Sequence, residues 1–208
     1  MQKYCQRAKK LLADSANNVN PYDSFKPEVP VGFYLQPGTE EFDALEDSGL
    51  DELSKVGFVL IAGGLGERLG FSSIKISLPV ITVVEDYTYM QYYAQYALAC
   101  KEAALRRNPT LDRATFYVPF AIMVSDDTHD RTVKLLESHD YFGLSKDRVD
   151  IIKQENVPAM MDNSARLAFK DGKVDTKPHG HGDIHNLLFD SGVAAKWQSL
   201  GKEWMIFI

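Results

Sequence analysis

The pattern of apolar and polar positions predicts strands that alternate with helices along most of the chain. Residues 57–62, GFVLIA, form a continuous apolar run of strand length that stops at Gly63–Gly64. Unbroken apolar strands are typical of a parallel sheet that is covered on both faces. Similar runs predict further strands at 117–124, 149–153 and 203–208.

The segments between these runs show helical periodicity or loop composition. We expect helices at 1–18, 40–54, 86–107, 128–138 and 183–200, a proline-rich loop at 20–39 and a hairpin around Asp171–Gly172. Strands that alternate with helices indicate an α/β fold with a doubly wound, mostly parallel sheet.

The helix expected at 86–107 carries an aromatic and small-residue stripe. The positions that recur at helical spacing are Tyr89, Tyr93, Tyr96, Cys100 and Ala103, with Met90, Ala94 and Ala97 beside them. Such a stripe belongs to the core more often than to a base-stacking surface, so we interpret it as core.

Composition and charge narrow the class of protein. The chain has 208 residues, 45% of them apolar, and a formal net charge of −6. This balance is that of a globular protein and argues against a nucleic-acid partner. Cys5 and Cys100 are too few for a disulfide framework or a zinc finger. Because no apolar stretch suits a bilayer span or a secretory signal, we expect a cytoplasmic protein with no membrane partner.

The first strand runs into a glycine-rich loop, GGLGERLG, at Gly63–Gly70. A dinucleotide fingerprint requires glycine where Leu69 stands, and a P-loop requires Gly-Lys-Ser/Thr where Gly70 is followed by Phe71. What remains is a loop of backbone N–H groups with two cations, Arg68 and Lys75, which suits a polyphosphate. The alternative is a tight turn whose charges are simply solvated.

Polar residues also follow the next two strands. Asp126 and Asp127 could hold a magnesium ion, but we favour them as caps of the following helix. Gln154 follows the third strand, and its amide could complement a uracil edge, although most glutamines are surface residues.

A cluster of histidines lies near the C-terminal end, in KPHGHGDIH at 177–185. His179, His181 and His185, with Asp183, permit three interpretations: a metal site, a ligand-binding loop or a structural loop. The alternating glycines indicate close approach of the backbone to another group.

Taken together and in this order, five segments resemble the UDP-sugar pyrophosphorylases, uridylyltransferases that accept several sugar 1-phosphates. They are FVLIAGGLGERLGFSSIKISLP, FAIMVSDDTHDRT, KQENV, NSARLAF and KPHGHGDIHNLLFDSG. The related UDP-glucose pyrophosphorylases have Thr after the third glycine and Pro before the lysine. This chain has Glu67 and Ile74 there, as the broad-specificity branch does.

The resemblance implies a Rossmann-like nucleotidyltransferase core, with a mixed, mostly parallel sheet flanked by helices. It also implies the reversible reaction of UTP with a sugar 1-phosphate to give a UDP-sugar and pyrophosphate. The substrates are small molecules and the cofactor is Mg²⁺, whose protein ligand is expected beyond residue 208, so no residue of this chain is assigned to the metal.

The family's pattern assigns roles to nine residues. Lys75 would neutralise the triphosphate, Arg68 would hold the departing pyrophosphate, and His181 would reach the α-phosphate. The nucleotide would otherwise contact the backbone at Ala62, Gly63, Gly64 and Gly180, the side chain of Met123 near the base, and Gln154 at the uracil edge. On this interpretation the three histidines form no metal cage, and Glu67 and Asp183 have no assigned role.

The resemblance also implies the organisation of the chain. We expect a helical and loop segment at 1–55, followed at 56–208 by the first part of a catalytic domain that is incomplete at its C-terminus. We therefore expect this chain alone to bind UTP weakly and to be inactive. The alternative functions are a dinucleotide-binding oxidoreductase domain and a non-catalytic metal-binding or scaffold protein.

Overall fold

The computed structural model describes residues 2–81 and 86–208, without the side chains of Arg68 and Ile81. These residues form two compact units. The smaller unit contains the chain up to Leu35 together with Asn156–Pro178, and the larger contains Gln36–Glu155 together with His179–Ile208. The domain boundary expected between residues 55 and 56 stays a prediction.

A four-stranded parallel sheet organises the larger unit. Its strands are β1 (Val56–Ile61), β4 (Phe120–Val124), β5 (Val149–Lys153) and β10 (Trp204–Phe207), in the spatial order β10-β1-β4-β5. The strand order reverses direction at β1, so the point between β1 and β10 is the topological switch point of a doubly wound sheet. The expected α/β fold is confirmed.

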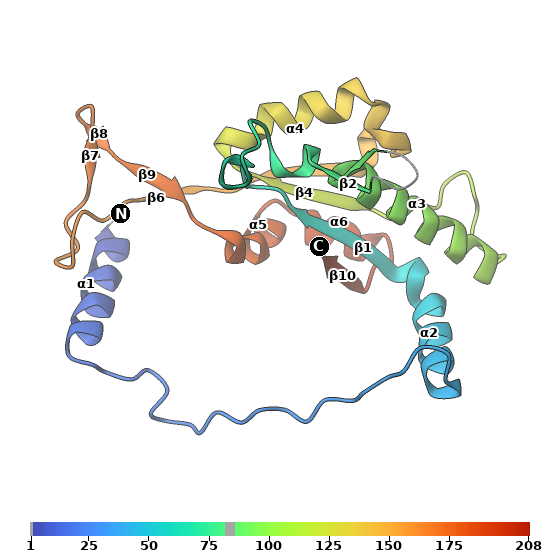
Figure 1. Ribbon diagram of the computed structural model, residues 1–208, viewed down its shortest axis with the longest axis horizontal. Helices are drawn as coiled ribbons and strands as arrows, with labels where there is room; N and C mark the ends of the chain where they lie inside the picture. Colours follow the sequence, from blue (N-terminus) through green and yellow to red (C-terminus); the bar gives the residue numbers. More distant parts are fainter. Residues whose placement is uncertain (1, 82–85) are drawn as a thin grey trace. The chain divides into compact units, whose positions relative to one another are not determined.

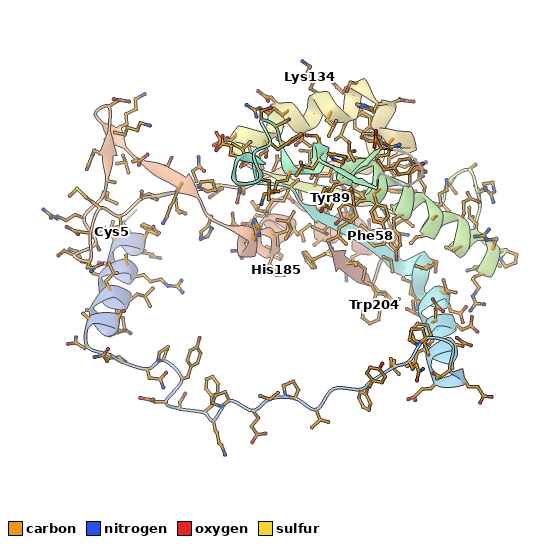
Figure 2. The ribbon with its side chains drawn as sticks, viewed as in Figure 1. Cys5, Phe58, Tyr89, Lys134, His185 and Trp204 are labelled. Atoms are coloured by element: carbon orange, nitrogen blue, oxygen red, sulfur yellow. The ribbon has the colours of Figure 1, made fainter. Side chains whose placement is uncertain are left out.

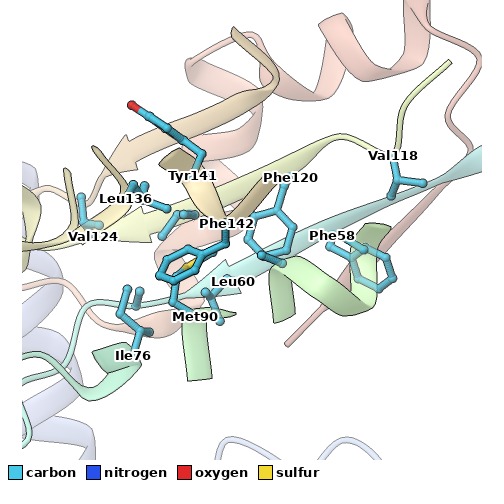
Figure 3. Packing of buried hydrophobic residues seen from close by; sticks show 14 of the residues in the cluster. Phe58, Leu60, Ile76, Met90, Val118, Phe120, Val124, Leu136, Tyr141 and Phe142 are labelled. Carbon is cyan, nitrogen blue, oxygen red and sulfur yellow. The ribbon is translucent and has the colours of Figure 1, made fainter. Parts of the chain in front are cut away.

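Helices cover both faces of this sheet (Figure 1). α3 (Tyr89–Arg107) and α4 (Asp126–Ser138) pack on one face, and α5 (Ile184–Asp190) and α6 (Val193–Ser199) on the other. Alternate residues of β1 serve the two layers, because successive side chains of a strand point to opposite faces. Phe58 and Leu60 join the α3/α4 layer, which Figure 3 shows, whereas Val59 joins the α5/α6 layer. This double burial explains why β1 and β4, whose residues are almost all buried, are unbroken apolar runs.

The α5/α6 layer is closed by a tryptophan that packs on a glycine. Trp197 is fully buried, and a Cβ added to Gly57 of β1 would lie 2.5 Å from Trp197 Cζ3. The indole Nε1 donates to Asp150 Oδ2 at 3.1 Å. The sheet therefore requires glycine at this position of β1.

Two details differ from the sequence-based expectations. The helix expected at 183–200 is two helices, because Gly192 adopts a left-handed conformation with φ of +76° between them. The core stripe of α3 consists of its small residues and one methionine: Met90, Ala94, Ala97, Cys100 and Ala104. Tyr89 and Tyr96 flank it and remain 39% and 50% exposed. Small side chains let α3 approach the sheet closely, which large rings would prevent.

Shorter elements complete the larger unit. α2 (Glu40–Glu52) and η1 (Leu53–Lys55) precede β1. Four elements follow β1, namely η2 (Glu67–Leu69), η3 (Lys75–Ser77), and the antiparallel strands β2 (Pro79–Ile81) and β3 (Tyr87–Thr88). Between α4 and β5 lie η4 (Asp140–Gly143) and η5 (Lys146–Arg148), and η6 (His181–Asp183) precedes α5.

The smaller unit joins the N-terminal helix to two antiparallel strand pairs. α1 (Gln2–Ala16) is linked to β6 (Asn156–Pro158) by Tyr4 Oη, which donates to Pro158 O at 2.8 Å. β6 pairs with β9 (Thr176–Pro178), and β7 (Phe169–Lys170) pairs with β8 (Lys173–Val174) across the expected Asp171–Gly172 turn. Across both units, none of the helices described is long and apolar enough to cross a membrane.

Candidate functional site

Main-chain hydrogen bonds bring three strand ends together at the carboxyl edge of the sheet. Ala62 N donates to Met123 O at 2.8 Å, and Gln154 N donates to Val124 O at 2.8 Å. The residues that follow β1, β4 and β5 therefore lie side by side, next to the switch point. In open α/β sheets this edge is where ligands bind.

Gln154 is a buried amide that packs against the glycine-rich loop. The residue is only 4% exposed, and its Nε2 lies 2.7 Å from the position of a Cβ added to Gly63. Its Oε1 has no hydrogen-bond partner within the described residues. Leaving a buried acceptor unpaired costs about 1–3 kcal/mol. The unpaired amide oxygen therefore makes Gln154 a candidate ligand-binding residue, because a hydrogen-bond donor on a ligand would remove this cost.

The glycine-rich loop holds Lys75 next to its backbone. Lys75 N donates to Gly64 O at 3.2 Å, and the Lys75 side chain, from Cδ to Nζ, lies 3.3–3.5 Å from a Cβ added to Gly64. Glycine at 64 thus leaves room for the lysine stem, whose residue is exposed to solvent. Arg68 lies in η2, and its side chain falls outside the described residues.

Met123 lies directly below the carboxyl edge of the sheet, and its expected contact with a base stays a prediction. Its side chain is fully buried in the layer under α5 and α6, and only its carbonyl reaches the Ala62 amide. The structure thus places Met123 beneath the site rather than at its surface.

The start of α4 corrects the expected helix caps. The N-cap is Ser125, which forms a capping box with Thr128, and Ser125 N donates to Thr128 Oγ1 at 2.9 Å. Asp126 lies within the first turn and forms an ion pair of 2.9 Å with Lys153, which raises the pKa of that lysine. Ser125 Oγ also donates to Gly63 O at 3.2 Å. Since Ser and Asp cap equally well, sequence could not choose between neighbouring positions.

The loop at 179–183 returns to the sheet beside Gln154. The chain leaves the larger unit after Glu155 and re-enters it at His179, whose N–H donates to Glu155 O at 3.1 Å. Gly180 follows with φ of +111°, a conformation that favours glycine. His181 then opens η6 with an exposed side chain.

The three histidines of this loop have different environments. His179 Nδ1 and Asp183 Oδ1 are 2.8 Å apart, and the Asp183 side chain is 6% exposed. Asp183 Oδ2 has no hydrogen-bond partner within the described residues. The His185 ring packs against Phe207, with ring centroids 5.1 Å apart. Among residues 2–81 and 86–208, no three His, Cys, Asp or Glu side chains are grouped so that they could hold a metal ion.

Two of these contacts were not found from the sequence. The Ser125 hydroxyl on the Gly63 carbonyl depends on tertiary structure, and nothing in the sequence marks it. The His179–Asp183 pair could not be found from helical spacing either, because His179 and Gly180 precede η6 and Gly180 has φ of +111°.

The sequence of the chain is similar to those of known uridylyltransferases and pyrophosphorylases. A family profile described as UTP–glucose-1-phosphate uridylyltransferase matches residues 5–208. The chain is 47% identical to a UDP-sugar pyrophosphorylase of Oryza sativa subsp. indica and 45% identical to one of Arabidopsis thaliana. Each alignment covers 98% of this chain and 33% of the relative. The chain thus spans about a third of the length of these relatives.

Solved structures show the same fold. A UDP-N-acetylglucosamine pyrophosphorylase structure from Entamoeba histolytica superposes with a TM-score of 0.66 at 22% identity, covering 77% of this chain and 40% of that one. A Trypanosoma brucei uridine diphosphate N-acetylglucosamine pyrophosphorylase, solved with an inhibitor, gives 0.67 at 20% identity, covering 80% and 35%.

Proposed function

Because the chain belongs to the UTP–glucose-1-phosphate uridylyltransferase family, we propose that it forms the nucleotide-binding part of a uridylyltransferase. The reaction would be the reversible conversion of UTP and a sugar 1-phosphate into a UDP-sugar and pyrophosphate. The observation that carries this proposal is the buried Gln154 amide, with an unpaired Oε1, packed against Gly63 at the sheet edge.

Gln154 would select the base. Uracil presents an N3–H donor between two carbonyl oxygens, so it can donate to Oε1 and accept from Nε2 of one amide. Cytosine has no N3–H, and a buried site built around a hydrogen bond discriminates strongly against a ligand that lacks the matching group. The backbone at Gly180, on the loop that returns beside Gln154, would contact the same base.

Lys75, Arg68 and His181 would act on the phosphates. A non-bridging oxygen of the sugar phosphate attacks the α-phosphorus of UTP in line, the bond from that phosphorus to the β-phosphate oxygen breaks, and pyrophosphate leaves. Phosphoryl-type transfer needs positioning and charge neutralisation more than covalent help. Lys75 suits this role because its stem lies alongside the backbone of Gly64 in the glycine-rich loop.

Mg²⁺ remains part of the proposal. Mg²⁺ neutralises phosphate charge and is usually held by one or two carboxylates together with substrate phosphates. In the described part of the chain, Asp126 is paired with Lys153 and Asp183 with His179, and no three candidate ligands gather. These residues do not form a metal site by themselves, so we derive no step through the ion.

Three finer points are proposals as well. Broad sugar specificity is supported by the relatives named UDP-sugar pyrophosphorylase, at 45–47% identity. A cytoplasmic location is supported by two unpaired cysteines, Cys5 and Cys100. The small-molecule partners would be UTP and sugar 1-phosphates.

Calorimetric titrations with UTP, CTP and NADP⁺ test the proposal. We expect the chain to bind UTP more tightly than CTP and to ignore NADP⁺. Gln154→Leu should remove the preference for UTP, whereas Gln198→Leu, at an exposed position of α6, should keep it. Equal affinity of the unaltered chain for UTP and CTP would contradict the assignment of Gln154.

A further inference from the structure

A second polar site lies outside the nucleotide site, between the loop that leads into η3 and the outer part of α4. It is a groove of about 380 Å³ whose polar lining consists of Ser72, Ser73, Ser77, Ser138, Arg131 and Lys134. No carboxylate of residues 2–81 or 86–208 lines it, although the chain contains 29 Asp and Glu residues. None of the nine residues assigned to the nucleotide lines it either.

Within the described residues, the two cations of the groove lie on one helix without an acidic partner. Arg131 and Lys134 lie one turn apart on α4, where like charges destabilise a helix. The nearby Asp130 is bonded to His129 and Glu137 to Lys146, both at 2.8 Å. Within the part of the chain that the structure describes, neither cation of the groove has a carboxylate within ion-pair distance.

The loop contributes further polar groups to the groove. Arg131 Nη1 donates to Ser72 O at 3.5 Å, which places the guanidinium against the loop. Ser77 and Ser138 already donate their hydroxyl protons to main-chain carbonyls. Within the described residues the hydroxyls of Ser72 and Ser73 make no hydrogen bond, so they are available to an anion. Lys134 lies on the outer side of α4, as Figure 2 shows.

We propose that this groove binds the phosphate group of a small phosphorylated metabolite. A phosphate monoester is a dianion near neutral pH, and the two unpaired cations match its charge. Arginine binds phosphate through two parallel N–H groups and lysine supplies a point charge, while hydroxyls complete the set of donors. An unpaired pair of cations in an acidic protein is thus explained by a ligand.

The groove is mechanically connected to the glycine-rich loop. Gly66 N donates to Ser73 O at 2.8 Å, and Leu65 and Ile74 form an antiparallel bridge. A phosphate between Ser73 and α4 would hold this segment in place and, with it, Lys75. The site would then raise the affinity for UTP. This consequence rests on the proposed function, whereas the binding of phosphate does not.

Amide chemical shifts of the chain, titrated with inorganic phosphate at constant ionic strength, test the site. We expect saturable shifts at residues 72–77 and 131–138. The double variant R131Q/K134Q should bind phosphate at these residues at least tenfold more weakly. The matched control is K101Q/R106Q on α3, which removes the same two residue types and the same charge and should leave the affinity unchanged.

Three results would overturn the site: sodium chloride reproducing the shifts, shifts confined to Gly63, Gly64 and Lys75, or unchanged affinity in R131Q/K134Q. The proposed function fails separately. A chain that binds phosphate in the groove but shows no preference for UTP over CTP would keep the phosphate site and lose the uridylyltransferase assignment.

Discussion

Lys202 is a buried amine that bonds main-chain carbonyls and, in the part of the chain that the structure describes, has no carboxylate partner. Its Nζ donates to Ser54 O at 2.8 Å and to Tyr117 O at 3.0 Å, and it lies 4.6 Å from the centroid of the Phe116 ring. The residue is 9% exposed, and burial lowers its pKa to about 8. Lys202 precedes β10, Ser54 precedes β1 and Tyr117 precedes β4. One ammonium therefore links the segments that lead into three neighbouring strands.

The lowered pKa predicts an unusual dependence of stability on pH. An unfolded lysine has a pKa near 10.4, so between about pH 8 and 10.4 the unfolded state binds more protons than the folded state. The contribution of Lys202 to the free energy of unfolding therefore rises with pH across this window. With the folded pKa of about 8, linkage gives a gain of about 2 kcal/mol between pH 7 and pH 9.5.

Lys202→Met removes this titration while retaining a long apolar stem. We expect the difference in unfolding free energy between the unaltered chain and the variant to shift by about 2 kcal/mol in favour of the unaltered chain from pH 7 to pH 9.5. Urea denaturation followed by the fluorescence of the buried Trp197 measures it. Lys101→Met on α3 is the control and should show no such shift. Parallel pH profiles for the Lys202 variant and the unaltered chain would refute the reasoning.

Three further substitutions test individual contacts. Gly57→Ala places a methyl group 2.5 Å from Trp197 and should cost about 1–3 kcal/mol of stability in urea denaturation, as overpacking does. Gly63→Ala should displace the Gln154 amide and weaken UTP binding about tenfold in calorimetry, with a smaller effect on thermal stability. Asp183→Ala releases the histidine bonded to it and should weaken UTP binding several-fold, while Asp183→Asn, which keeps an acceptor, should restore most of the affinity.

Each of these has a result that would count against it. Unchanged unfolding in Gly57→Ala would mean that the indole shifts without cost. A Gly63→Ala chain that binds UTP as before would separate Gln154 from base recognition. If Asp183→Asn binds UTP as weakly as Asp183→Ala, the carboxylate charge rather than its hydrogen bond is what the loop requires.

The sheet could be predicted from the sequence because burial on both faces leaves a direct trace. β1 and β4 are apolar or glycine at every position, whereas β5 has Asp150 and Lys153 among its five residues and leaves a weaker trace. Periodicity was less informative for α3. It located the apolar stripe, but it could not tell that the small residues rather than the tyrosines face the sheet, since that depends on how closely the helix packs.

The candidate site could be predicted only in parts. The glycine-rich loop and Lys75 are local in sequence, so their chemistry is visible there. The proximity of Gln154 to the Gly180 loop is not, because the chain between Glu155 and His179 belongs to a different compact unit. The hydrogen bond from His179 N to Glu155 O shows in the structure that the two segments are neighbours.

The site has one rigid wall and one that is held by few bonds. The wall formed by Ala62 and Gln154 continues the main-chain ladder of the sheet, so it opens only when the sheet itself opens. The loop at 179–183 is joined to the residue after Gln154 by the hydrogen bond from His179 N to Glu155 O, whereas the His179–Asp183 pair lies within the loop itself. On the proposed function, we therefore expect changes in this loop to alter the rates at which a nucleotide binds and leaves more than the selection of its base by Gln154.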